Sequence, residues 1–195
     1  MPTRETSVDW MLALGRIAGA SFPFASSMVQ LQAELTGREL QARLRRIEDP
    51  ISHVHPQVRE VSEQIYAALT EKGDFPLTMS EEFYAQYARP LAMLEAELYL
   101  DATHAIGKRY AGGFWANNPA FVLYMCALFE DPAKMNALVQ RIDTAAPGTT
   151  VNGKALAAEL GLPVGTVRAV CETFADKGLG IMSKEVGATY YIARA

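Results

Sequence analysis

The stretch that decides the fold of this chain runs from Asn152 to Gly178 and reads NGKALAAELGLPVGTVRAVCETFADKG. Its first part holds three apolar residues at helical spacing, Leu156, Ala157 and Leu160. Asn152 precedes them as a good N-cap, and Gly161 follows them as a residue that ends helices readily. These signals predict a short helix between Asn152 and Gly161.

A second helix is predicted after Pro163, which suits the first helical position because a missing N–H costs nothing there. An apolar stripe continues to Gly178 through Val167, Val170, Cys171 and Phe174. The alternating run from Ile181 to Ile192, broken at Gly187, predicts a β-hairpin. Two short helices, a tight turn and a hairpin together predict a winged helix. We expect its core to contain Leu156, Leu160, Val167, Val170, Cys171, Phe174 and Leu179.

The run LAAELGLPVGTVRAVCETFADKGLG, followed by GATYYI, resembles the winged helix-turn-helix domains of bacterial transcription regulators. The Leu-Ala pair, Leu-Gly-Leu, Thr-Val-Arg and Lys-Gly-Leu stand at similar spacings in that superfamily. The resemblance covers about a quarter of the chain. It implies a fold more than a function, because winged helices also serve as protein-docking modules.

Composition describes a globular protein without a pronounced basic character. Half of the 195 residues are hydrophobic, which excludes global disorder. Lys and Arg number 18 and Asp and Glu 22, so the formal net charge is −4. From residue 146 onward five basic and four acidic residues leave +1, and the rest of the chain carries −5. The bulk charge therefore does not indicate a nucleic-acid binder.

Localisation is predicted from cysteines and hydropathy. Cys126 and Cys171 lie in apolar helical stripes and form no disulfide framework, which fits a reducing cytoplasm. Residues 11–31 are apolar, but Arg16 and Pro23 interrupt them. We therefore predict a cytoplasmic protein with no membrane span.

Residues 1–50 are predicted to form an N-terminal helical arm, with a long helix from Ser27 to about Glu48. Its two apolar stripes consist of Met28, Leu31 and Leu35, then Leu40, Leu44 and Ile47. Such stripes predict a homo-oligomer, which we expect to be a dimer, or packing on the chain's own core. The second half of the arm is rich in arginine, with Arg38, Arg43, Arg45 and Arg46. These side chains could form a phosphate-binding surface, but we favour a solvated polar face of the helix.

The remaining chain divides into a helical domain at 51–118, connecting helices at 119–145 and the winged helix at 146–195. In the helical domain we expect helices from Pro56 to Lys72, after Ser80 and from Pro90, then a hairpin. When the sequence of this domain is aligned with that of the last domain at an offset of eighty residues, residue types match without gaps. The matched pairs are Tyr87 with Val167, Leu91 with Cys171, Leu94 with Phe174, Gly107 with Gly187, and Tyr110 with Tyr190. The domain is therefore a candidate for a second, divergent winged helix, although Leu98 stands where the helix-stopping Gly178 does. Overall the patterns predict a mainly α protein with small β-hairpins.

No motif indicates catalysis. The chain has no phosphate-binding G-x-x-x-x-G-K-[ST], no G-x-S-x-G and no H-E-x-x-H. Its histidines are His53, His55 and His104, too few for a tetrahedral metal site without Cys ligands nearby. We therefore expect neither an enzyme nor a cofactor or metal.

Two binding functions remain. In the first, a dimeric regulator reads double-stranded DNA with the second helix of its winged helix. Val164, Gly165 and Thr166 would approach base edges, Arg168 a base or phosphate, and Lys184, Lys108 and Arg109 the backbone. In the second, the fold docks a protein, because the outer face of that helix (Gly165, Arg168, Ala169, Glu172, Asp176) carries two acids that repel phosphates. The resemblance favours DNA, which we take as the leading expectation, and the charge favours protein.

Overall fold

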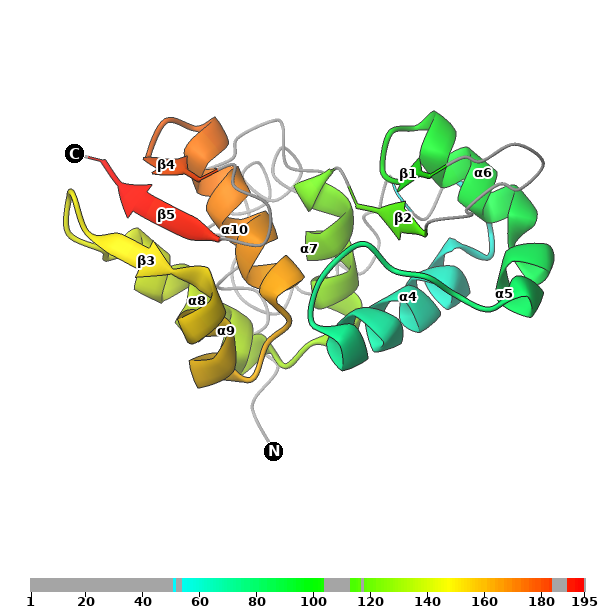
Figure 1. Cartoon of the computed structure of the whole chain (residues 1–195), viewed down its shortest axis with the longest axis horizontal. Coiled ribbons are helices and arrows are strands. Elements are labelled where there is room, and N and C mark those ends of the chain that lie inside the picture. The colour runs from blue at the N-terminus through cyan, green and yellow to red at the C-terminus, as the bar shows by residue number, and fades with distance from the viewer. Residues whose placement is uncertain (1–50, 52–53, 104–112, 117, 184–188, 195) are drawn as a thin grey trace, which may run out of the picture.

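The computed structural model describes residues 51, 54–103, 113–116, 118–183 and 189–194. They form a mainly helical molecule with small antiparallel sheets, which confirms the predicted class (Figure 1). The helices are α4 (Val58–Lys72), α5 (Glu81–Gln86), α6 (Ala88–Ala96), α7 (Pro119–Phe129), α8 (Pro132–Asp143), α9 (Gly153–Leu160) and α10 (Val164–Asp176). The strands are β1 (Asp101–Ala102), β2 (Phe114–Trp115), β3 (Thr150–Asn152), β4 (Gly180–Met182) and β5 (Tyr190–Ala193). The N-terminal arm, Lys108, Arg109 and Lys184 lie outside the described residues.

Two lobes flank a central helix, α7 (Figure 1). The N-terminal lobe contains α4, α5, α6, β1 and β2, and the C-terminal lobe contains α8, α9, α10, β3, β4 and β5. Every residue of α7 from Ala120 to Cys126 is buried, because the helix packs on α4 on one side and on α10 on the other. One hydrophobic core runs through both lobes. The relation between the lobes is therefore built into the core.

Side-chain caps mark the starts of α7, α8 and α9, the last of them at Asn152 as predicted. Asn118 Oδ1 accepts from Ala120 N at 2.9 Å, and Asp131 Oδ1 accepts from Ala133 N at 2.9 Å. Asn152 Oδ1 accepts from the N–H groups of Lys154 and Ala155, both at 3.1 Å. Each bond satisfies a backbone donor at a helix start that has no partner within the helix.

The C-terminal sheet has strand order β3-β5-β4, with Val151 and Met182 both paired to Tyr191. The strand β3 was not predicted from the sequence. A strand of three residues is too short to show alternation, and pairing with the distant β5 defines it. The helix before this strand, α8, packs on α9 and α10.

Leu179 was expected in the core, but its exposed fraction is 42%. Gly180 is buried under the ring of Tyr191, so the alternation of β4 turns Leu179 and Ile181 to the outer face of the sheet. Leu160 is only partly buried, whereas the other expected core residues of this lobe are buried. The expectation was therefore wrong for Leu179.

The N-terminal lobe repeats the order of elements in the C-terminal one. Leu77 forms a β-bridge with Phe114 of β2, and β2 pairs with β1. The order Leu77, β2, β1 therefore parallels the order β3, β5, β4 of the C-terminal sheet. The matched helix residues Tyr87, Leu91 and Leu94 are buried, like their counterparts in α10. The offset between the lobes changes after the hairpin loop. Phe114 takes the place that Tyr191 has in the C-terminal sheet, and these two residues are 77 rather than eighty positions apart.

Two details of this lobe differ from expectation. The helix α6 begins at Ala88, so Pro90 lies in its first turn and does not open it. Leu98 ends that helix in a left-handed conformation, φ 60°, as Gly178 does in the C-terminal lobe with φ 75°. The helix stop is therefore present without its glycine.

Candidate functional site between the lobes

The first turn of α10, expected to face DNA bases, is packed inside the molecule. Thr166 has an exposed fraction of 0%, and its Oγ1 lies 3.5 Å from the Sγ of Cys126 on α7. Gly165 and Ala169 are buried too, whereas Val164 is partly buried. The expectation that Gly165 and Ala169 belong to an exposed face, and that Gly165 and Thr166 are available to base edges, is wrong for this arrangement. The apolar surfaces of α7 and α10 cover each other instead.

Gly165 allows the two lobes to approach at the end of α4. Its N–H donates to the carbonyl of Gly73 at 3.2 Å. A Cβ built on Gly165 would lie 3.1 Å from the Cδ1 of Leu69 and 3.4 Å from the ring of Phe75. The glycine thus allows the lobes to pack closely. A glycine inside a helix costs about 1 kcal/mol of stability relative to alanine.

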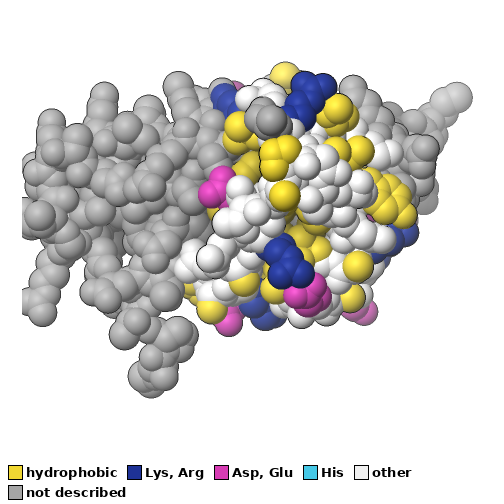
Figure 2. Space-filling model, turned by 90° about the vertical axis from the view of Figure 1, so that its left-hand side faces the viewer, with side chains coloured by type: hydrophobic (Ala, Val, Ile, Leu, Met, Phe, Trp, Pro, Cys, Tyr) yellow, Lys and Arg dark blue, Asp and Glu magenta, His cyan; other side chains and the backbone are white. Residues whose placement is uncertain are grey.

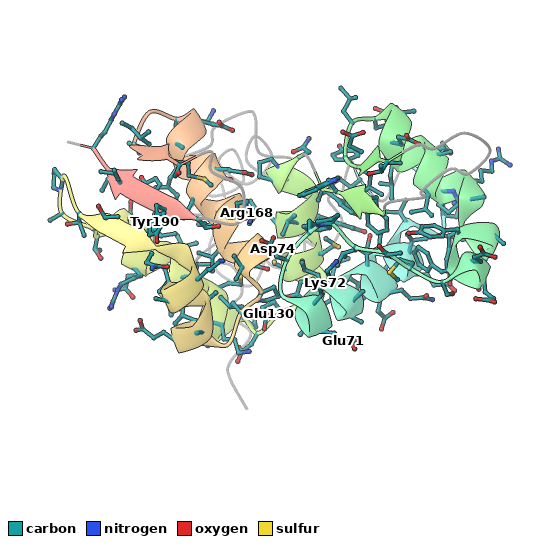
Figure 3. The ribbon with its side chains drawn as sticks, in the orientation of Figure 1. Glu71, Lys72, Asp74, Glu130, Arg168 and Tyr190 are labelled. Atoms are coloured by element: carbon teal, nitrogen blue, oxygen red, sulfur yellow. The ribbon has the colours of Figure 1, made fainter. Side chains whose placement is uncertain are left out.

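Arg168 is paired with a carboxylate of the opposite lobe. Its Nη2 donates to Oδ2 of Asp74, in the turn after α4 (Figure 3). Asp74 also accepts from the N–H of Phe75 at 2.8 Å through Oδ1, which fixes the carboxylate. The side chains are 23% and 27% exposed. The guanidinium predicted to reach a base or phosphate therefore has an internal partner.

Glu172 follows one turn later on α10 and is partly buried. Burial raises the pKa of its carboxyl; Arg168 acts in the opposite direction, and the charges of Asp176 and Asp74 raise it further. Among the described residues, the Glu172 side chain has no hydrogen-bond or ion-pair partner. Its carboxylate is partly desolvated and has no direct counter-ion in the part of the chain that the structure describes.

These side chains border a cavity of about 150 Å³ between the lobes, which we name the inter-lobe pocket. It is lined by Phe75, Trp115, Ala116, Val122, Gly165, Arg168, Ala169 and Glu172. The N-terminal lobe contributes the two aromatic rings, α7 contributes Val122, and α10 contributes the charges. Pockets for small-molecule ligands usually measure about 300 to 1,000 Å³. The inter-lobe pocket is closer to the size of one side chain.

A second polar tie joins α4 to the end of α7. The Tyr66 hydroxyl donates to Oε2 of Glu130 at 2.5 Å. Burial raises the pKa of this phenol, with Cys126 and Glu130 adding to the effect. The other carboxylate oxygen of Glu130 accepts from the N–H of Asp131 at 2.8 Å and lies 3.5 Å from the amine of Lys134. The contact holds the N-terminal lobe and α8 in a fixed relation.

The buried thiols of Cys126 and Cys171 belong to this core. Burial raises the pKa of each to about 12, so both are protonated at neutral pH. A protonated, inaccessible thiol is a poor nucleophile. Within the described ranges, no three His, Cys, Asp or Glu side chains are grouped as metal ligands would be.

The N-terminal lobe has an acidic surface. Residues 54–103 include nine Asp and Glu residues but only three Lys and Arg residues. The acids are Glu60, Glu63, Glu71, Asp74, Glu81, Glu82, Glu95, Glu97 and Asp101, and the bases are Arg59, Lys72 and Arg89. This excess of negative charge opposes close approach of a phosphate backbone.

The outer face of the C-terminal sheet is apolar. Figure 2 views the molecule from this side and shows hydrophobic side chains scattered among few charged ones. Leu179, Ile181, Tyr190 and Ile192 are each about two-fifths exposed. Ile181 and Ile192 stand directly opposite each other on β4 and β5. The sheet thus presents four partly exposed apolar side chains on its outer face, which favours contact with another apolar surface over contact with phosphate.

Comparisons with protein-family models, with curated proteins and with solved structures found no match to this chain. No helix in the described part of the chain is long and apolar enough to cross a membrane.

Sequence reasoning found Arg168 but missed Asp74, Phe75 and Trp115. Asp74 lies 94 residues before Arg168 and looks like an ordinary loop acid after a helix-ending glycine. Trp115 stands in a two-residue strand with no periodicity to mark it. The signal that remained in the sequence was the pair of acids on α10, which already argued against a phosphate partner.

Proposed function

We propose that this chain is a tandem winged-helix protein that binds another protein rather than reading DNA. Each lobe runs helix, strand or bridge, two helices and hairpin, and the sheet neighbours follow the same order. Counting α8 as the first helix of the C-terminal unit supports the winged-helix interpretation of that lobe. The N-terminal lobe supports a second, divergent copy.

One observation carries this choice. A helix-turn-helix protein reads DNA by placing the N-terminal residues of its second helix in the major groove. Here the corresponding residues, Gly165 and Thr166, are buried against α4 and α7, and Arg168 pairs with Asp74. Exposing them would require separating the lobes along a shared core. The acidic N-terminal lobe and the apolar outer sheet face favour a protein partner over a phosphate backbone.

The test is a fluorescence-anisotropy titration of a labelled random DNA duplex with the full-length protein at about 50 mM and about 150 mM salt. Low salt strengthens nonspecific attraction to phosphate, so it is the condition most favourable to DNA binding. We expect no saturable binding at micromolar protein in either buffer.

Micromolar binding that weakens steeply with salt would overturn the proposal in favour of the DNA-binding regulator that the sequence resembles. In that case, alanine variants of the three basic residues expected to contact the DNA backbone can be compared with wild type. Lys108→Ala, Arg109→Ala and Lys184→Ala would then each weaken binding and reduce the salt slope by about one unit for every lost phosphate contact.

A further inference from the structure

The charges around the inter-lobe pocket do not balance. Arg168 stands between two carboxylates, and Asp74 takes its guanidinium in a direct ion pair. Glu172 remains on the pocket wall without a direct partner among the described residues, and the exposed Asp176 adds a further negative charge one turn away. The lining itself holds one positive and one negative side chain, Arg168 and Glu172, and the nearby Asp74 and Asp176 make the surroundings of the pocket net negative, which favours a cation.

The position of Glu172 makes such a cation favourable. Glu172 has lost part of its hydration, and the neighbouring positive charge that favours its ionised form is that of Arg168, which is already paired with Asp74. An incoming ammonium or guanidinium would form a charge-assisted hydrogen bond in a site already partly shielded from water. Asp74 cannot meet the same need, because it is already bonded to Arg168 and to the Phe75 N–H.

The remaining lining suits the apolar stem of a basic side chain. Trp115, 38% exposed, and Phe75 line the pocket from the N-terminal lobe, while Val122 and Ala169 line it from the core side. Lysine and arginine bury their methylene groups on such surfaces while the charged end reaches a polar partner. Aromatic rings also attract cations at their faces.

Size and wider charge indicate the source of the cation. A volume of about 150 Å³ accommodates one side chain better than a metabolite or a folded element. The acidic N-terminal lobe beside the pocket attracts a basic surface over a longer range. Both features fit a side chain presented by a protein.

We propose that the inter-lobe pocket receives one lysine or arginine side chain from a basic segment of a partner protein, with Glu172 as its counter-ion and Trp115 and Phe75 covering its stem. This inference rests on the proposed function and deepens it. It assigns the face of α10 beside Arg168 to partner recognition, although the neighbouring first turn of that helix is buried.

The test uses full-length protein labelled with ¹⁵N at its two tryptophans, Trp10 and Trp115, whose indole signals are assigned with Trp10→Phe. The probes are N-acetyl-arginine amide and N-acetyl-lysine amide, with N-acetyl-norleucine amide as the uncharged control. We expect both cationic probes to shift the Trp115 signal saturably with a Kd of about 1 mM, as befits ligands of this size. The norleucine probe should leave it unchanged.

Two matched variants decide the role of the carboxylate. Glu172→Gln keeps the shape of the side chain and should weaken both cationic probes about tenfold or more. Glu159→Gln, an acid of the same lobe that lies 3.7 Å from Arg141 and outside the pocket, should not change them. Absence of a cation-dependent shift at about 20 mM probe, or equal affinities in wild type and Glu172→Gln, would overturn the inference.

The two proposals fail separately. A negative result with the cationic probes removes the pocket assignment and leaves protein binding to be located elsewhere, as on the outer sheet face. Salt-dependent duplex binding in the anisotropy experiment removes the proposed function, whatever the tryptophan signal does.

Discussion

Leu98 adopts a backbone conformation that its side chain disfavours. Its φ is 60°, and the N–H of Tyr99 bonds the carbonyl of Leu94 at 2.9 Å, as that of Leu179 bonds Phe174 at 3.1 Å after Gly178. A left-handed conformation costs a non-glycine residue about 1 to 2 kcal/mol. The side chain is 75% exposed, so little buried apolar surface offsets that cost.

Leu98→Gly should therefore stabilise the protein. We expect about 0.5 to 1 kcal/mol, since relief of strain exceeds the added flexibility of the unfolded chain. Urea denaturation measures the difference. Gly178→Ala is the matched control and should destabilise by about 1 kcal/mol. A Leu98→Gly protein that unfolds at lower urea than wild type would show that Leu98 makes a stabilising contact.

Glu172 gives stability a pH dependence of defined sign. Its pKa is raised in the folded protein, mainly by burial, so the folded state binds the proton more tightly than the unfolded state. Stability then falls as pH rises from the ordinary carboxyl pKa through the raised one. Arg168 opposes this shift, whereas Asp74 and Asp176 reinforce it.

We expect Glu172→Gln to be more stable than wild type at neutral pH and to lose this advantage as pH falls below the ordinary pKa of glutamate. Thermal melts from pH 3.5 to pH 7.5 measure the difference in melting temperature between Glu172→Gln and wild type. The control Glu159→Gln, on the exposed face of α9, should show no comparable crossover. A gap that widens toward acid pH would contradict the assignment.

At the scale of elements, α10 is held to the turn after α4 by the Arg168–Asp74 pair and by the Gly165 N–H bond to Gly73. The pair is about a quarter exposed, so solvent screening limits its contribution. Arg168 therefore has a structural role in the contact between the lobes.

A double-mutant cycle with Arg168→Ala and Asp74→Ala tests this role. We expect each single change to destabilise and the coupling to be about 0.5 to 1.5 kcal/mol, above that of most exposed pairs. Denaturant unfolding provides the four free energies. The pair Arg141 and Glu159, 3.7 Å apart and mostly exposed, is the control and should couple by less than about 0.5 kcal/mol. Additive effects of Arg168→Ala and Asp74→Ala would mean that the ion pair does not stabilise the lobe contact.

At the scale of the whole molecule, self-association through residues 1–50 remains a prediction from the two apolar stripes of the arm. Sedimentation compares the full chain with a version that begins at Pro50, which keeps the buried Ile51. We expect the full chain to form dimers at micromolar concentration and the shorter version to be a monomer. Two monomers would mean that the arm packs on its own chain, and two dimers would place the interface elsewhere, for example on the apolar outer face of the C-terminal sheet.

Much of the element order was predictable from sequence because its causes are local. Asn118, Asp131 and Asn152 bond donors two or three residues away, and Gly73 and Gly161 end their helices with left-handed conformations. The apolar stripes likewise repeat within single helices, so their buried faces follow from spacing alone. Localisation and the mode of self-association stay predictions from the sequence.

The tertiary structure alone decided what α10 faces. A helix with Gly165, Thr166 and Arg168 in its first turns is typical of a DNA-reading surface, and nothing local distinguishes it from a packing surface. Contacts with Leu69, Cys126 and Asp74 bury or pair these three residues. The partners lie 96, 40 and 94 residues earlier in the chain, respectively, so no short window of sequence holds both sides. The strand β3 was hidden for the same reason, since its identity comes from hydrogen bonds to β5 across the sheet.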